Sequence, residues 1–207
     1  MKDFDAELKS RAGDRPILGN GEYILWNGKP KKTPFMLAQS LTMLPIAIVW
    51  ICFDFGAISS IFSSGGFQLF LLGFFALHLM PVWIWLGMTV SAPRRWRNTD
   101  YFLTNRRIII RGGFLAVNEK SLFFKDIRSV QNKIGLYDKL CGTGSILFNS
   151  EMDTGKNTLT PSFQYLDNAG QVYERVQRTV LDMQTDMEFP NAYRPSDNPG
   201  YGTDYKL

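Results

Sequence analysis

Residues 100–114 read DYFLTNRRIIIRGGF, and this stretch decides the fold that we expect for the C-terminal half of the chain. Two β-rich runs, Asp100–Thr104 and Arg106–Arg111, stand on either side of a tight turn that contains Asn105. Gly112-Gly113 marks a second turn directly after them. The stretch therefore predicts an antiparallel hairpin that begins a larger sheet.

The two adjacent arginines of this hairpin are not expected to point the same way. Because side chains alternate along a strand, Arg106 shares a face with Ile108, and Arg107 shares the opposite face with Arg111. We predict that Arg107 and Arg111 form a solvent-facing pair. Arg106, at the start of the strand, is expected to brace the turn or to reach lipid headgroups.

Short β-prone runs continue after the hairpin, as expected for a mainly β domain. They are Ser121–Phe124, Asp126–Val130, Ser145–Phe148 and Phe163–Leu166. Ile134–Leu140 is expected to be a short irregular or helical segment, and Asn149–Thr160 a polar loop. An earlier run, Glu22–Trp26, either adds a strand to the same sheet or lies on a membrane surface.

A change of period then predicts a helix at the C-terminal end of this domain. Apolar residues recur every three or four positions at Val172, Val176, Val180, Met183 and Met187. Such a stripe most simply closes an open end of a curved sheet, and the alternative is a partner-binding face. The tail at 188–207 has no periodic pattern and is expected to be disordered.

The N-terminal half has the composition of a membrane anchor. Between Thr33 and Pro93 the only formal charge is Asp54. Phe35–Phe53 and Phe67–Val90 are apolar runs of 19 and 24 residues. As helices they reach roughly 28 and 36 Å, enough to cross a hydrocarbon core of about 30 Å. We predict a two-helix transmembrane hairpin at 35–92; the alternative is a pair of buried core helices.

Basic residues predict the orientation of this hairpin. Residues 1–34 contain seven Lys and Arg, the connection Asp54–Gly66 contains none, and Arg94, Arg95 and Arg97 follow the second run. The positive-inside rule then places both termini in the cytoplasm of a multi-pass plasma-membrane protein.

Polar groups inside the hairpin are few. His78, the only histidine of the chain, is expected level with Met43 and needs a partner at that depth, such as Thr42 or the carbonyl freed by Pro45. We expect His78 to join the two helices as a neutral ring, with a proton-responsive or conducting site as the alternative. Asp54 is expected at the outer interface, in contact with solvent.

Several of these segments together resemble the membrane-flanked bacterial pleckstrin-homology-like family, bacterial PH domain 2 (DUF304). The resemblance rests on residues 100–114, on LFFKDIRSV at Leu122–Val130, on KLCGTGSILF at Lys139–Phe148 and on GEYILWNGKP at 21–30. It implies a PH-like domain at 96–187, in which a bent antiparallel sheet is capped by a C-terminal helix. It implies little about activity.

No residue pattern in the chain predicts catalysis. The domain after the hairpin has no histidine for a nucleophile–histidine pair, and no Cys/His spacing suggests a metal. Gly142-Thr143-Gly144 lacks the remaining residues of a nucleotide-binding loop. We therefore expect neither an enzyme nor a cofactor or metal site.

Positive charge concentrates where the domain leaves the predicted hairpin. Between Arg94 and Arg111 there are six arginines and one acidic residue. We predict a membrane-anchored module that binds lipid headgroups or a protein partner, and not nucleic acid. The candidate contacts are Arg94, Arg95, Arg97, Arg106, Arg107, Arg111, Lys125 and Arg128. The alternatives are an oligomeric membrane scaffold and, resting on His78, a small channel or transporter subunit.

Overall fold

A computed structural model describes residues 16–63, 69–150 and 161–188 of the chain. Most of the predicted polar loop, and the predicted tail beyond Glu188, lie outside these ranges. The chain divides into two compact units. We call them the β unit, up to Lys31 and from Asn98 onward, and the helical unit, Lys32–Arg97.

The β unit contains the hairpin that the sequence predicted. Strands β2 (Asp100–Thr104) and β3 (Arg107–Gly112) pair antiparallel. Ile108 lies in the hydrophobic core and Ile110 packs against it, whereas Ile109 is buried outside that core cluster. This confirms the predicted alternation of side chains along β3.

The first sheet has four strands in the order β1-β2-β3-β4. Strand β1 (Ile24–Gly28) pairs antiparallel with β2, and β4 (Asn118–Phe123) pairs antiparallel with β3. The N-terminal run is therefore a strand of this sheet, which decides between the two alternatives that its sequence left open.

A second, three-stranded sheet follows after a short 3-10 turn, η1 (Phe124–Asp126). Its strands are β5 (Ile127–Lys133), β6 (Gly144–Ser150) and β7 (Ser162–Leu166), in that spatial order and all antiparallel. The four predicted β runs after the hairpin thus correspond to β4, β5, β6 and β7.

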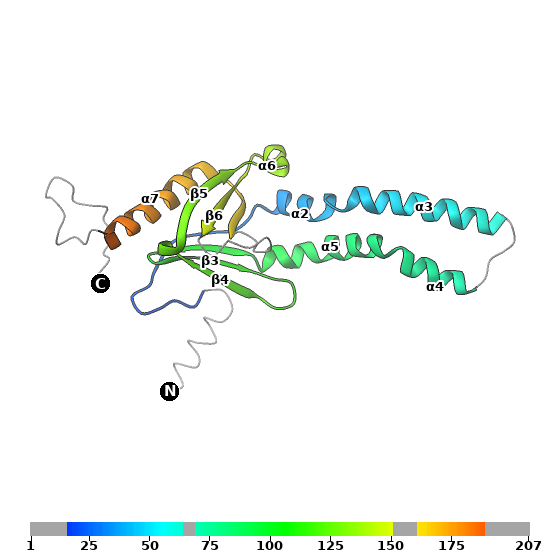
Figure 1. The fold of residues 1–207 in the computed structure, drawn as a ribbon, viewed down its shortest axis with the longest axis horizontal. Coiled ribbons are helices and arrows are strands. Elements are labelled where there is room, and N and C mark those ends of the chain that lie inside the picture. The colour runs from blue at the N-terminus through cyan, green and yellow to red at the C-terminus, as the bar shows by residue number, and fades with distance from the viewer. Residues whose placement is uncertain (1–15, 64–68, 151–160, 189–207) are drawn as a thin grey trace, which may run out of the picture. The chain divides into compact units, whose positions relative to one another are not determined.

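Helix α7 (Ala169–Glu188) closes the second sheet and contacts β5, β6 and η1 (Figure 1). Val176, Val180 and Met183 are buried in the core and Val172 packs against it. The apolar stripe of α7 is therefore a packing face. Two antiparallel sheets followed by this helix are compatible with a PH-like fold.

Aromatic rings join the two sheets in the core. The ring of Phe163 on β7 stacks on Tyr101 of β2 at 4.9 Å between centroids and meets Phe148 of β6 edge-on at the same distance. The hydroxyl oxygen of Tyr101 also accepts the backbone N–H of Gln164 at 3.1 Å. These contacts hold β2 of the first sheet against the second sheet.

The segment expected to be irregular or helical contains a short helix, α6 (Leu136–Cys141). Asp138 is buried, and its carboxylate accepts hydrogen bonds from the Gly135 N–H and from the Thr143 and Ser145 hydroxyls. This network connects both ends of α6 to the start of β6.

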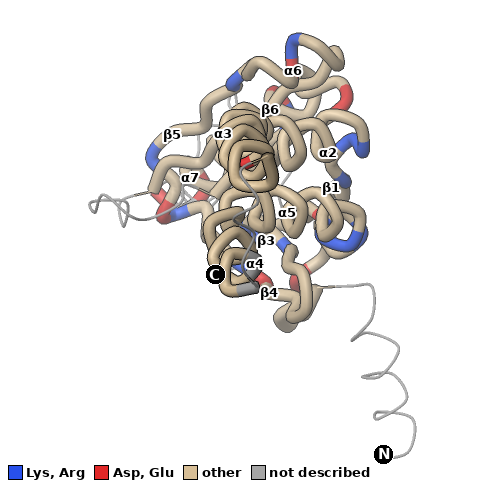
Figure 2. The backbone as a smooth tube through the Cα atoms, turned by 90° about the vertical axis from the view of Figure 1, so that its right-hand side faces the viewer, with Lys and Arg blue, Asp and Glu red and all other residues tan. Residues whose placement is uncertain are grey.

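The helical unit consists of α2 (Lys32–Leu41), α3 (Leu44–Ser63), α4 (Leu69–His78) and α5 (Met80–Arg97). Both α2 and α3 pack against α5. Figure 2 shows almost no charged residue along α3 and α4, and in the sequence of these two helices the only Asp, Glu, Lys or Arg is Asp54.

Prolines explain where the helices of this unit are interrupted. Pro45 and Pro81 lie in the first turns of α3 and α5, where the missing N–H of proline costs no intrahelical hydrogen bond. The preceding helices end at Leu41 and His78.

The predicted end of the first apolar helix was wrong. The first apolar helix was expected to end at Phe53 and Asp54–Gly66 to be a connection, but α3 continues to Ser63. A single charged residue does not stop a helix, and none of the residues between Asp54 and Ser63 is a proline. The helix therefore continues through the position of its only charge.

Candidate functional site

The turn between β2 and β3 binds the N-terminal segment of the β unit. The side chain of Asn105 accepts the N–H of Tyr23 at 3.1 Å and donates to the carbonyl of Gly21 at 3.2 Å. The Asn105 N–H in turn donates to the Tyr23 carbonyl at 3.2 Å. An asparagine at this turn thus extends the pairing of β1 and β2 by supplying both a donor and an acceptor.

Arg107 forms a bidentate ion pair with Glu22. Its Nε donates to Oε1 at 2.9 Å and its Nη2 to Oε2 at 3.0 Å. The exposed fractions of the two side chains are 19% and 3%. Planar pairs of this kind are among the stronger hydrogen-bonded contacts in proteins.

The same carboxylate lies 2.8 Å from the hydroxyl oxygen of Thr104 and accepts the N–H of Gly19 at 2.8 Å. Burial raises the pKa of Glu22, but the hydrogen bonds from Arg107, Gly19 and Thr104 outweigh this effect. The pKa of Glu22 is therefore below its ordinary value, and the side chain is held as a carboxylate.

The expectation that Arg107 faces solvent was consequently wrong. Its guanidinium also donates to the carbonyl of Ile17 at 2.8 Å and to the Ser121 hydroxyl at 3.1 Å. Glu22 lies 85 positions away in the chain, so no local pattern around residue 107 could have revealed it. Of the two adjacent arginines, Arg106 is the exposed one.

The remaining predicted basic contacts lie in three different places. Arg94, Arg95 and Arg97 form the last turn of α5. Arg111 stands on β3 opposite two acidic residues, Asp100 and Glu119. Lys125 of η1 and Arg128 of β5 are exposed. Within the β unit, Arg111 thus lies on a different strand from Arg128, and Lys125 lies on η1, whereas within the helical unit Arg94, Arg95 and Arg97 share one helical turn.

In the helical unit, half-buried His78 and buried Asp54 form a polar pair. Nδ1 of His78 lies 2.8 Å from Oδ1 of Asp54, whose side chain is only 2% exposed. Two expectations were thus wrong: Asp54 is not in contact with solvent, and the partner of His78 is neither Thr42 nor a freed carbonyl. The longer α3 shifts the contact, because it places Asp54 rather than Met43 beside His78.

Trp50 makes a second contact at the same point. Its indole N–H donates to the His78 carbonyl at 2.7 Å. In a regular helix the Val82 N–H would donate to the His78 carbonyl. Here it donates to the Leu79 carbonyl instead, so the His78 carbonyl is available to Trp50. Trp50 and Asp54 are four residues apart on α3, so together they hold one face of α3 against the break between α4 and α5.

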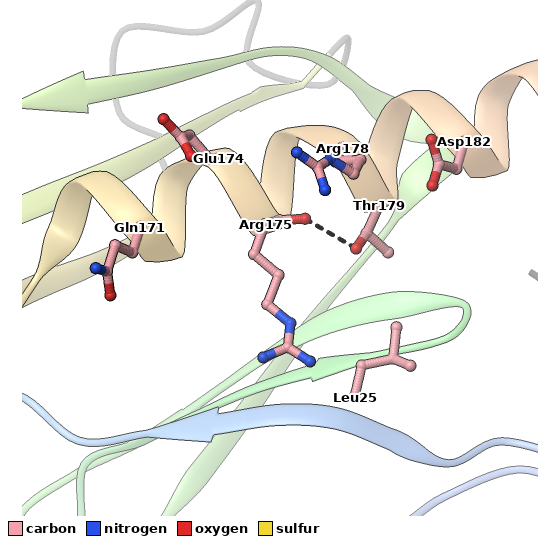
Figure 3. A pocket seen from close by; sticks show the side chains of 7 residues that line it. All are labelled: Leu25, Gln171, Glu174, Arg175, Arg178, Thr179 and Asp182. Atoms are coloured by element: carbon pink, nitrogen blue, oxygen red, sulfur yellow. Dashed lines mark hydrogen bonds between the residues drawn. The ribbon is translucent and has the colours of Figure 1, made fainter. Parts of the chain in front are cut away.

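A cleft of about 440 Å³ lies along α7 on the side of β1 (Figure 3). Charged side chains of both signs line it, and its one aliphatic contribution is Leu25. Arg175 extends from α7 toward the strand that carries Leu25 (Figure 3). A mixed-charge lining of this kind suits a polar protein segment better than an apolar small molecule.

The described residues contain no candidate metal centre. Among residues 16–63, 69–150 and 161–188 there is no group of three or more His, Cys, Asp or Glu side chains that could hold a metal ion. The two cysteines, Cys52 and Cys141, are both free.

A family model described as a bacterial PH domain matches residues 43–180, which is more than half of the chain. Neither the curated proteins nor the solved structures include a significant match to this sequence. The matched region begins in the helical unit and ends within α7, so it includes parts of both units.

Proposed function

We propose, since this chain belongs to the bacterial PH domain family, that it is a membrane-anchored binding module without enzymatic activity. Domains of this family are generally non-catalytic binding modules. The helical unit would cross the plasma membrane as a two-helix hairpin, and the β unit would lie at the cytoplasmic face.

The observation that carries this proposal is the exposure of apolar side chains on the helical unit. Lys32–Ser63 is a helical stretch of 32 residues, long and apolar enough to cross a membrane, and only 11% of its most apolar window is buried. Large exposed side chains continue on the other helices, including Phe70, Leu77 and Val90. A core helix of a soluble protein would bury such residues, whereas a bilayer is the solvent that they favour.

Basic residues support the proposed orientation. Lys32 begins α2, its ammonium group lies 5.7 Å from the ring centroid of Trp96 on α5, and Arg97 ends α5. The first and last turns of the helical unit thus meet at one end, and both are basic. The sequence between α3 and α4 contains no basic residue, so the positive-inside rule favours a cytoplasmic location for both termini.

The ligand that we favour is the anionic lipid headgroup, bound at the basic end of the helical unit by Lys32, Arg94, Arg95 and Arg97. Each basic residue near a bilayer surface contributes about 1 kcal/mol of attraction to anionic lipid. Arg107 is not part of this proposal, because its guanidinium already contacts Glu22. The second candidate is a protein partner in the cleft beside α7, because charged side chains of both signs line that cleft.

Membrane insertion can be tested in whole cells with single cysteines. In a background that carries Cys52→Ala and Cys141→Ser, one variant adds Ser63→Cys at the end of α3 and another adds Gln177→Cys on α7. A membrane-impermeant maleimide should label position 63 in intact cells and position 177 only after permeabilisation, and the chain should resist extraction by alkaline carbonate. Carbonate extraction of the chain would overturn the proposal.

Headgroup binding can be tested with full-length protein in nanodiscs. Its thermal midpoint should be higher in discs containing phosphatidylglycerol than in discs of phosphatidylcholine alone. The triple variant Arg94→Gln, Arg95→Gln, Arg97→Gln should lose most of this difference, while the matched variant Lys125→Gln, Arg128→Gln should keep it. If the second variant loses the difference and the first does not, the contacts lie on the β unit instead.

Two earlier alternatives stay predictions. The oligomeric scaffold has no observation in its favour among the described residues. For a small channel or transporter subunit, the Asp54–His78 pair is the relevant observation, since it places a buried carboxyl group beside the histidine.

A further inference from the structure

Apolar side chains project from the β unit in two segments. The β3–β4 tip carries Phe114, Leu115 and Val117, which are 38–79% exposed. The α6 projection carries Ile134, Leu136 and Leu140, which are 57–69% exposed. Among the described residues of the β unit, six of the ten large hydrophobic side chains that are exposed lie in these two segments. Single exposed hydrophobic residues are common on protein surfaces, but such a concentration is not.

The β3–β4 tip is bonded to the point at which the chain leaves the helical unit. The side-chain amide of Asn98 donates to the carbonyls of Gly113 and Phe114 at 3.2 and 3.4 Å. Asn98 directly follows Arg97, the last residue of α5. The tip is therefore held to the first residue after the apolar helices.

The α6 projection is bonded in the same way to the point at which the chain enters the helical unit. The ammonium group of Lys31 donates to the carbonyl of Cys141, the last residue of α6, at 3.4 Å and pairs with Asp167 at 3.0 Å. Lys31 directly precedes Lys32, the first residue of α2. Both projections also lie at the same end of the β unit in Figure 1, away from the C-terminal end of α7.

The backbone fixes the shape of both projections. Gly113 has a φ of 154°, and a Cβ at this position would lie 1.9 Å from the carbonyl oxygen of Ala116, so only glycine permits the turn. In α6 the buried Asp138 network holds the helix, and Gly142 ends it in the left-handed conformation at a φ of 65°. The apolar side chains are thus presented on rigid supports.

We propose that the β3–β4 tip and the α6 projection insert into the interfacial layer of the bilayer that the helices cross. This inference rests on the proposed membrane anchoring. One residue spans about 3.8 Å, so projections bonded to Asn98 and Lys31 lie close to wherever α5 and α2 reach the membrane surface. Exposed Lys133 precedes the α6 projection and exposed Lys139 lies within it, as basic residues accompany apolar ones in segments that lie in the membrane interface.

The bilayer is a better occupant than a second copy of the chain, because both segments are bonded to residues that directly adjoin the apolar helices in the sequence, Asn98 and Lys31. With the tip and α6 inserted, the β unit would be attached to the membrane by two covalent linkers and two apolar contacts. Its orientation at the surface would then be restricted, and the surfaces away from both projections, including the C-terminal half of α7, would be left accessible to partners.

The test uses the full chain in nanodiscs of phosphatidylcholine and phosphatidylglycerol, with Cys52→Ala and Cys141→Ser. An environment-sensitive fluorophore is attached to a cysteine at Leu115, at Leu136 or, as a control, at Leu181, which is half-exposed on α7. Lipids with a spin label near the headgroup should quench the first two fluorophores and shift their emission to the blue, and should leave the third unchanged. Unchanged thermal unfolding of each labelled chain shows that the substitution is tolerated.

Three outcomes would overturn the inference in distinguishable ways. If the first two fluorophores stay in water while the chain resists carbonate extraction, the projections do not insert, although the anchoring stands. If the blue shift occurs without quenching and grows with protein concentration, the segments contact another copy of the chain. If carbonate extracts the chain, the anchoring fails and the inference fails with it.

Discussion

Asp54 and His78 are 24 positions apart in the chain, and their side chains meet at 2.8 Å inside the helical unit. This pair joins α3 to the end of α4, and Trp50 supplies a second hydrogen bond beside it. Oδ2 of Asp54 has no hydrogen-bond partner among the described residues. The carboxylate therefore depends on His78 for its one polar side-chain contact there.

Replacing His78 with leucine should destabilise the helical unit. His78→Leu leaves the Asp54 carboxylate buried without a partner, a change that costs about 3–5 kcal/mol in comparable buried pairs. The double variant Asp54→Leu, His78→Leu should recover most of that loss, because neither polar side chain remains. Thermal unfolding of the full chain in detergent measures both, and equal destabilisation of the single and double variants would contradict the pairing.

Removing the partner of Arg107 should weaken the attachment of the N-terminal segment to the β2–β3 turn. Glu22→Gln replaces a charged bidentate contact by neutral hydrogen bonds, and we expect a loss of about 2 kcal/mol of unfolding free energy. Glu119→Gln, an exposed acid on β4, serves as the control and should change stability by less than about 0.5 kcal/mol. Denaturant titration followed by circular dichroism compares the two variants.

The same ion pair predicts a dependence of stability on pH. The pKa of Glu22 is lower in the folded chain than in the unfolded one, so its contribution is present above the unfolded value of about 4.3. That contribution is lost as the pH falls through the unfolded and then the folded pKa. Between about pH 5 and pH 3 the parent chain should lose more unfolding free energy than Glu22→Gln, and parallel curves would exclude Glu22 as the cause.

Tyr101 predicts the opposite pH dependence, a loss of stability as the pH rises into the alkaline range. Burial raises the pKa of its phenol, so its contribution is present below the unfolded value of about 10 and is lost as the pH rises above it. Tyr101→Phe should cost about 1 kcal/mol at neutral pH, since the Gln164 N–H loses its acceptor. Between pH 9 and about pH 11 the variant should lose less additional stability than the parent chain, as measured by denaturant titration.

Two substitutions on α7 separate its packing face from its outer face. Val176 is fully buried, whereas Leu181 is half-exposed. Val176→Ala should cost about 2 kcal/mol through lost burial and a cavity, and Leu181→Ala should cost well under about 1 kcal/mol. Similar losses in thermal unfolding for both variants would contradict the assignment of the stripe to the core.

Local patterns in the sequence were sufficient to predict most strands and helices of the β unit. The alternation in residues 100–114, the turns at Asn105 and Gly112-Gly113, and the three-to-four period after Val172 each reflect backbone geometry over a few residues. For this reason the hairpin, the later strands and α7 were predicted close to their observed limits. The apolar character of the helical unit was likewise evident from its sequence, which contains almost no charged residues between Thr33 and Pro93.

Contacts between distant residues were decided only by the tertiary structure. The predicted exposure of Arg107 and Asp54 and the predicted partner of His78 were wrong, because the true partners lie 85 and 24 positions away. Which residues meet depends on where a helix ends and on how β1 lies against β2, and neither follows from local propensity. The sequence by itself determined the elements and their apolar faces, whereas the three-dimensional packing decided which charged groups are paired and which remain at the surface.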